Sequence, residues 1–193
     1  TAKKLGISTL NQSPNYYGLS LVLGGGEVKL LDITSAYGVF ATDGLQVAYN
    51  PILKIEDEQG NVLEEYRTPT PKRVLPSQIA RLINDILSDN QARAPMFGSH
   101  SFLYFEDYRV AAKTGTTQNY RDGWTIGYVP NLVTGVWVGN NDNSPMAQKP
   151  AVLTAGPIWH EFMKKAFQYY QPKPFQKPQP ITANKPILNG ILT

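Results

Sequence analysis

Cysteine is absent from this sequence, which excludes disulfide bonds and zinc sites built on thiolates. Histidine is scarce: His100 and His160 stand far apart, and no acidic residues lie beside them at the spacing of metal ligands. We therefore expect no metal site and no cofactor, and we expect both histidines to serve in surface or helix packing. The lack of cysteine suits an exported bacterial protein and a cytoplasmic protein equally, so the compartment stays open on this count.

Long apolar runs are missing as well. No stretch approaches the roughly 20 apolar residues that a membrane-spanning helix needs. The opening Thr1-Ala2-Lys3-Lys4 does not lead into the apolar core of a signal peptide. We expect any membrane anchor or targeting signal to lie outside this chain.

Charge of one sign is not concentrated in any block. The chain has 18 lysines and arginines against 15 aspartates and glutamates, a net charge of +3 that is scattered along the sequence. Nucleic acid is therefore not an expected partner, because its binding proteins gather basic residues on one face.

The length and hydrophobic content fit one globular domain with a tail. The 193 residues are 41% hydrophobic, enough to bury a core. We predict residues 1–170 as this domain. Prolines crowd the remainder, so residues 171–193 are predicted to be an extended tail that is disordered or draped over the surface rather than bound to a partner.

Apolar residues recur at helical spacing in three segments. The first segment follows Glu27, has apolar positions at Leu30, Ile33, Tyr37 and Phe40, and is predicted to end near Asp43-Gly44. The second begins at Ser77 after Pro76, and its apolar stripe consists of Ile79, Leu82, Ile83, Ile86 and Leu87. The third is predicted over residues 158–167, opened by Ala155-Gly156-Pro157.

From residue 102 onward the pattern is that of a β-sheet. We predict a strand or strand lead-in at 102–105 and strands at 108–113, 123–128 and 132–139. Pro130-Asn131 makes a tight reversal, so the last two strands are predicted to be antiparallel neighbours. Trp124 and Trp137 alternate with apolar residues in these strands and are predicted to be core residues rather than a platform for sugars.

A surface β-hairpin is predicted earlier in the chain, at residues 51–66, where two short alternating runs flank a turn at Gly60-Asn61. The elements together indicate an α/β fold of the α+β type, in which helices flank an antiparallel sheet.

Lys113-Thr114-Gly115-Thr116 is the segment most suggestive of chemistry. Lysine supplies a positive charge that can bind a carboxylate or activate a nearby hydroxyl, and the threonines supply hydrogen-bond donors. Glycine inside a strand permits the backbone of a ligand to come close. A regular strand places Lys113 and Gly115 on one face and the threonines on the other, whereas a bulge at the glycine would bring them together. The segment predicts an anion-binding edge; the alternative is an ordinary strand with a polar end.

The surrounding sequence closely resembles the transpeptidase domain of bifunctional class A penicillin-binding proteins. Lys-Thr-Gly is a motif of penicillin-binding proteins and serine β-lactamases. The resemblance extends through Asp122, Trp124 and residues 126–142, and it includes earlier landmarks in the same order, covering roughly residues 5–167. These landmarks are Leu5-Gly6-Ile7, Leu23-Gly24-Gly25-Gly26-Glu27, Thr34-Ser35-Ala36-Tyr37, Phe40-Ala41 with Asp43-Gly44, and Ala92-Arg93-Ala94.

The resemblance implies roles for the motif in acyl transfer. It implies that Lys113, Thr114 and Thr116 bind the carboxylate of a donor stem peptide or a β-lactam, and that Gly115 lies beside them. The backbone N–H of Thr116 is implied to form half of an oxyanion hole. Asp122 and Trp124 are expected to hold the turn after the strand. A membrane-anchored parent is also implied, with this domain on the extracytoplasmic face.

The family's nucleophile is not found in this sequence. It is the serine of Ser-x-x-Lys, and no serine here has a lysine three residues later. Ser13-Pro14-Asn15 spells Ser-x-Asn, but it follows Leu5-Gly6-Ile7, whereas the family's Ser-x-Asn precedes that landmark, so we interpret it as a turn. We expect this chain to hold an incomplete transpeptidase fold and half of its active site, with Ser-x-x-Lys carried by an upstream part of the same domain.

Two other functions remain open at this point. A non-catalytic binding or scaffold module of the cell-wall machinery could keep the fold without the serine. A β-lactamase or sensor of the same fold is the second alternative. Such a protein should have a compact end, so the hairpin at 51–66 and the long tail argue weakly against it.

Overall fold

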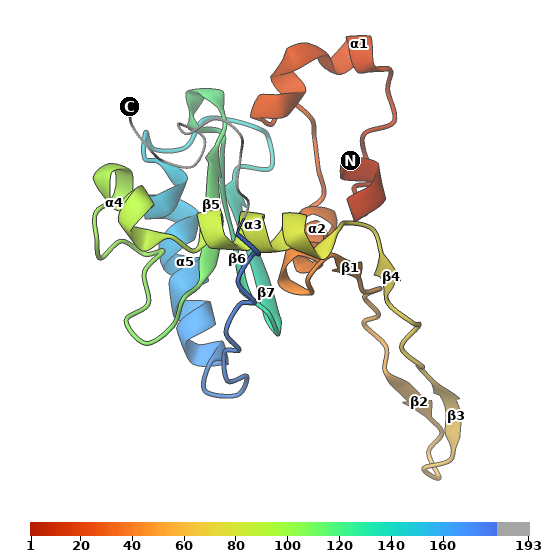
Figure 1. Ribbon diagram of the computed structural model, residues 1–193. Helices are drawn as coiled ribbons and strands as arrows, with labels where there is room; N and C mark the ends of the chain where they lie inside the picture. The colour runs from red at the N-terminus through yellow and green to blue at the C-terminus, as the bar shows by residue number, and fades with distance from the viewer. Residues whose placement is uncertain (181–193) are drawn as a thin grey trace.

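The computed structural model describes residues 1–180 (Figure 1). Its centre is a three-stranded antiparallel sheet of order β5-β6-β7, formed by Ala111–Thr116, Asp122–Val129 and Leu132–Gly139. Val129 pairs with Leu132 across the turn at Pro130 and Asn131, as the sequence predicts. The predicted antiparallel sheet flanked by helices is confirmed.

The two faces of the sheet are covered by different helices. Helix α5 (Ala151–Ala166) packs on one face, and α2 (Leu30–Ala41) packs on the other, together with α3 (Ser77–Leu87). Trp159 and Met163 of α5 are fully buried against the sheet. Gly127 of β6 leaves the room that the Trp159 ring fills, since a Cβ on that glycine would collide with the ring.

Helix α5 begins earlier than predicted. The sequence places its start near Pro157, but the helix runs from Ala151 and contains Pro157. Its first N–H group, on Ala151, donates to Thr116 Oγ1 at 2.9 Å, which satisfies one of the unpaired donors of a helix N-terminus. Burial of Val152 and Ala155 further stabilises this first part of the helix.

The first strand of the sheet also begins later than predicted, and residues 102–105 do not form a strand. β6 ends at Val129, and the chain before β5 is held instead by Arg93 of α4 (Asn90–Phe97). Its guanidinium donates to the carbonyl oxygens of Leu87, Leu103 and Val110 at 3.1, 3.0 and 3.4 Å, so these groups are satisfied without a strand partner. Burial lowers the pKa of Arg93 from its usual value.

The predicted stripe of α3 is only partly buried. Ile79 and Ile86 keep 45% and 67% of their surface exposed. The buried positions are instead Ala80 and Asn84. Asn84 Nδ2 donates to the Phe40 carbonyl at 3.0 Å and Asn84 Oδ1 accepts from the Tyr128 hydroxyl at 2.7 Å, so one amide joins α2, α3 and the sheet. Burial raises the pKa of Tyr128.

The N-terminal segment is tied to α2. It contains the short helices η1 (Ala2–Leu5), α1 (Pro14–Tyr17) and η2 (Gly18–Leu23). Asp32 of α2 accepts hydrogen bonds from the Ser8 N–H and hydroxyl at 2.8 and 2.6 Å, and these bonds hold the pKa of Asp32 below its usual value.

The predicted hairpin is a two-stranded arm that projects from the body (Figure 1). Strands β2 (Lys54–Glu56) and β3 (Val62–Glu65) pair antiparallel around the turn at Gly60. A second small ribbon, β1 (Leu45–Gln46) with β4 (Lys72–Arg73), lies at the base of the arm. The hairpin prediction is confirmed.

The first part of the predicted tail, residues 171–180, is mostly exposed and has no helix or strand; the rest of the tail lies outside the described residues. Two side-chain amides hold it. Asn131 donates to the Gln171 carbonyl and accepts from the Lys173 N–H, and Gln78 does the same with the carbonyl and N–H of Gln179. Between them, Phe175 packs edge-on against Tyr128. The tail therefore joins α3 to the sheet.

Replacing Phe175 by alanine should lower the free energy of unfolding by about 1 kcal/mol, because the ring is half-buried and loses its contact with Tyr128. Urea unfolding followed by circular dichroism measures the change. Phe162→Ala is the matched control, since Phe162 is 55% exposed on α5 and should change stability by less than about 0.5 kcal/mol. Equal effects of the two variants would show that the tail does not stabilise the fold.

Candidate active site

The Lys-Thr-Gly-Thr segment forms strand β5, and its pairing with β6 is regular. Lys113 pairs with Ile126, Gly115 with Trp124 and Thr116 with Gly123, without a register shift. The bulge that the sequence left open is therefore absent. Lys113 and Gly115 lie on the face covered by α2, and Thr114 and Thr116 lie on the face covered by α5.

The backbone N–H and C=O groups of Thr114 and Thr116 point away from the neighbouring strand β6. Thr117 N–H donates inward to the Asp122 carbonyl at 3.1 Å. Because N–H groups alternate in direction along a strand, those of Thr116 and Thr114 point to the opposite side. Within residues 1–180 no strand pairs with β5 on that side, so it is an edge of the sheet.

The lysine side chain reaches the same edge. Lys113 is exposed, and its Nζ donates to the outward carbonyl of Thr114 at 2.6 Å. A positive charge therefore lies beside the outward N–H groups of Thr114 and Thr116. An ammonium next to backbone N–H groups is suited to bind a carboxylate or an oxyanion.

Thr116 is held from the α5 face. Its Oγ1 accepts the Ala151 N–H at 2.9 Å. A hydroxyl can accept and donate at the same time, so the proton of this hydroxyl is left to donate to another group. The bond fixes the side chain of Thr116 to the start of α5.

Packing among residues 1–180 does not explain why position 115 is a glycine. A Cβ at this position would meet only the Trp124 Cβ at 3.6 Å, an ordinary contact distance. The fold of this chain therefore tolerates a side chain here, which agrees with a glycine that serves the approach of a ligand.

The turn after β5 is fixed by Asp122, as the sequence suggests, but with a different tryptophan. Asp122 Oδ2 accepts from the Thr117 hydroxyl at 2.9 Å, and Oδ1 accepts from Trp137 Nε1 at 2.8 Å. Trp124 instead packs against the Trp137 ring, with the centroids 6.3 Å apart. Both rings are half-buried on the α2 face, so the prediction of two core residues is only partly correct.

The remaining candidates have structural roles. Ser13 is the N-cap residue of the one-turn helix α1, which begins at Pro14, so Ser13-Pro14-Asn15 opens a short helix and does not form the predicted turn. His160 stacks on Phe105 with the centroids 4.5 Å apart, and His100 packs edge-on against Tyr104, as expected of packing histidines. Within residues 1–180 there is no cluster of three or more histidine or acidic residues with the geometry of a metal site.

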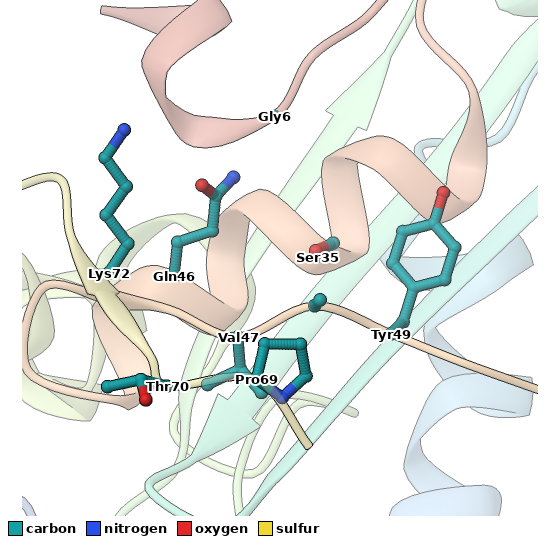
Figure 2. A pocket seen from close by; sticks show the side chains of 9 residues that line it. Gly6, Ser35, Gln46, Val47, Tyr49, Pro69, Thr70 and Lys72 are labelled. Carbon is teal, nitrogen blue, oxygen red and sulfur yellow. The ribbon is translucent and has the colours of Figure 1, made fainter. Parts of the chain in front are cut away.

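An open pocket lies elsewhere on the molecule. It is formed between the N-terminal segment, α2 and the base of the arm, and Figure 2 shows Tyr49, Gln46 and Lys72 among its lining residues. It shares no residue with β5. We place the candidate site at β5 because the charge and the outward N–H groups lie there.

Comparisons with known proteins agree on one family. A family model described as the penicillin binding protein transpeptidase domain matches residues 14–164. Penicillin-binding protein 1A of Aquifex aeolicus (strain VF5) is 38% identical over 178 residues, which cover 91% of this chain and 23% of that protein. Penicillin-binding protein 1A of Neisseria flavescens is 30% identical over 175 residues, which cover 86% of this chain and 21% of that protein.

Solved structures agree as well. The penicillin-binding protein PonA1 from Mycobacterium tuberculosis superposes with a TM-score of 0.77 at 25% identity, over 96% of this chain and 55% of that chain. PonA1 in complex with penicillin V gives a TM-score of 0.73 at 26% identity, over 93% of this chain and 52% of that chain.

The chain spans less than a quarter of the length of the two penicillin-binding proteins 1A, from Aquifex aeolicus and Neisseria flavescens. None of the helices among residues 1–180 is long and apolar enough to cross a membrane.

Proposed function

Because this chain belongs to the penicillin-binding protein transpeptidase family, we propose that it supplies the Lys-Thr-Gly wall of a peptidoglycan D,D-transpeptidase site. The observation that carries the proposal is the outer edge of β5. There the Lys113 ammonium lies beside outward N–H groups of Thr114 and Thr116. The substrates are stem peptides that end in D-Ala-D-Ala.

Substrate binding follows from the charges at this edge. The C-terminal carboxylate of the donor peptide binds the Lys113 ammonium and the hydroxyls of Thr114 and Thr116. Gly115 lets the peptide backbone come close to the strand. A β-lactam also presents a carboxylate next to a reactive carbonyl and binds in the same way, which agrees with penicillin V in the PonA1 complex.

The reaction needs a nucleophile from elsewhere. A serine of an upstream Ser-x-x-Lys attacks the carbonyl between the two D-alanines, and the serine proton passes to a base. The tetrahedral intermediate places its oxyanion at the Thr116 N–H, which stabilises the developing charge. The C–N bond then breaks, D-alanine leaves with a proton, and the acyl group passes from serine to the amine of a second stem peptide.

Because the serine comes from an upstream segment, this chain holds only part of the site. No serine here has a lysine three residues later, so this chain alone is expected to be inactive. Its partner is the upstream part of the same domain. The exposed Ile79 and Ile86 of α3 provide apolar surface that this partner could cover. The parent is membrane-anchored, with the site on the extracytoplasmic face.

Incubation with benzylpenicillin tests the proposal directly. Intact-mass spectrometry of a protein that contains this chain and its upstream segment should show one penicilloyl adduct, and peptide mapping should place it on the Ser-x-x-Lys serine. This chain expressed alone should stay unmodified. Benzylpenicilloic acid, in which the ring is already opened, is the negative control. Absence of an adduct on the longer protein would support the non-catalytic scaffold instead.

A further inference from the structure

The loop that joins β5 to β6 begins directly after Thr116, and four hydrogen bonds between three residues close it. Thr117 N–H donates to the Asp122 carbonyl at 3.1 Å, and Asp122 N–H donates back to Thr117 Oγ1 at 2.8 Å. The Thr117 hydroxyl donates to Asp122 Oδ2 at 2.9 Å, and Trp137 Nε1 donates to Oδ1 at 2.8 Å. Each oxygen of the carboxylate therefore has its own donor.

These bonds determine where the Thr116 N–H points. Thr117 can donate inward to Asp122 only when the preceding N–H points outward, toward the edge. Thr117, Asp122 and Trp137 lie on the α2 face of the sheet, whereas the Thr116 hydroxyl is bound to Ala151 on the α5 face. The Thr116 peptide is thus held from both faces of the strand.

The loop contains a backbone conformation that needs support. Asn119 and Tyr120 are consecutive non-glycine residues in the left-handed region, with φ of 59° and 54°. Asparagine tolerates this region, but tyrosine is unfavourable there, so contacts must hold the loop in this conformation. Met146 N–H donates to the Tyr120 carbonyl at 3.0 Å, and the contact between Thr117 and Asp122 holds the two ends. Loss of their contact would allow the loop to relax and the end of β5 to move with it.

We propose that Asp122 is a positioning residue for acyl transfer, acting through Thr117, with Trp137 fixing its carboxylate. Asp122 touches neither substrate nor serine; it aims the Thr116 N–H at the oxyanion. The proposal rests on the proposed function, because it assigns the Thr116 N–H to the oxyanion hole. Its consequence is that Asp122 affects the chemical step more than the binding of the carboxylate.

The test is made in the protein that carries the whole domain, with benzylpenicillin and separate measurement of its dissociation constant before acylation and its acylation rate constant. Asp122→Ala and Thr117→Val should each lower the rate constant by about 10- to 100-fold, as expected for a misplaced oxyanion donor. The dissociation constant should change by less than about threefold, because Lys113 still binds the carboxylate. Thr117→Ser keeps the hydroxyl and should restore the rate to within about threefold of the wild type.

Three further variants serve as a control, as a test of Trp137 and as a test of the proposed function. Asp142→Asn removes an exposed carboxylate that also holds a turn, through Ser144 N–H, and should leave the rate constant unchanged. Trp137→Phe removes the indole N–H and keeps a ring, so the rate should fall in the same direction by a smaller factor. Lys113→Ala reports on the proposed function itself.

The outcomes distinguish failure of the positioning role of Asp122 from failure of the proposed function. Normal acylation in Asp122→Ala and Thr117→Val, with a large loss in Lys113→Ala, overturns the positioning role and leaves the proposed function standing. Normal acylation in Lys113→Ala overturns the function. If Asp122→Ala lowers only the fraction of protein that can be acylated, and the remaining fraction reacts at the wild-type rate, the residue serves folding alone and the positioning role is wrong.

Discussion

Lys113→Ala should lower the rate constant for acylation by benzylpenicillin by about 100-fold or more in a protein that carries the complete site. The Nζ atom lies 2.6 Å from the outward carbonyl of Thr114, so its charge sits where the ligand carboxylate is expected. Alanine removes this charge and leaves the backbone of β5 in place. Stopped-flow mixing, or intact-mass spectra taken over time, measures the rate.

A matched lysine shows whether the effect is specific. Lys149 is also exposed and lies just before α5, whose first residue is bound to Thr116. Lys149→Ala makes the same change in net charge and should leave acylation within about twofold of the wild type, because it removes no group from the β5 edge. Similar losses in both variants would mean that general charge, and not the position of Lys113, attracts the ligand.

The parts of the fold that local sequence determines were predicted well. Strand β7 has its predicted limits because alternating apolar residues follow a Pro-Asn reversal, and the hairpin at 51–66 follows from its Gly-Asn turn. In both cases the residues that predict the element lie within it or directly beside it, so its formation depends little on contacts with distant parts of the chain.

The parts that were missed depend on distant contacts. Arg93 binds carbonyl groups of the residues before β5, and the Thr116 hydroxyl binds the first residue of α5. Asn84 is buried in α3 because it joins the Phe40 carbonyl to the Tyr128 hydroxyl. Periodicity assigns an asparagine to the solvent side of a helix, so it cannot reveal a polar residue whose partners are on other elements.

In the candidate site, too, local sequence predicts some features and distant contacts determine others. The motif at residues 113–116 predicts the groups that face a ligand, and the structure brings their charge and N–H groups to one edge. The role of Trp137 was not predicted, since it lies on β7 and its indole N–H meets Asp122 only after the strands pair. The one available signal was a hydroxyl and a carboxylate at the two ends of a short loop, Thr117 and Asp122, a pairing that often closes turns.

Trp159→Ala should have the largest effect on stability, lowering the free energy of unfolding of the transpeptidase domain by about 3–5 kcal/mol. The side chain is 0% exposed and lies in the core formed by α5 and the sheet. Gly127 cannot fill the resulting space, and its own backbone is fixed by pairing with both neighbouring strands. Urea unfolding followed by far-UV circular dichroism measures the change without relying on tryptophan fluorescence.

The control and the complementary variant test why the effect is large. Glu161 is exposed on the same helix, and Glu161→Ala should change stability by less than about 0.5 kcal/mol. Gly127→Ala should destabilise by about 1–3 kcal/mol, since its methyl group collides with the Trp159 ring. In the double variant Gly127→Ala with Trp159→Ala the collision with the ring is gone and only the 2.9 Å approach of the new Cβ to the Ala111 carbonyl oxygen remains, so the loss should be smaller than the sum of the two single losses. Additive losses would mean that the ring and the glycine do not fit each other as described, and that α5 is held on the sheet by its other contacts.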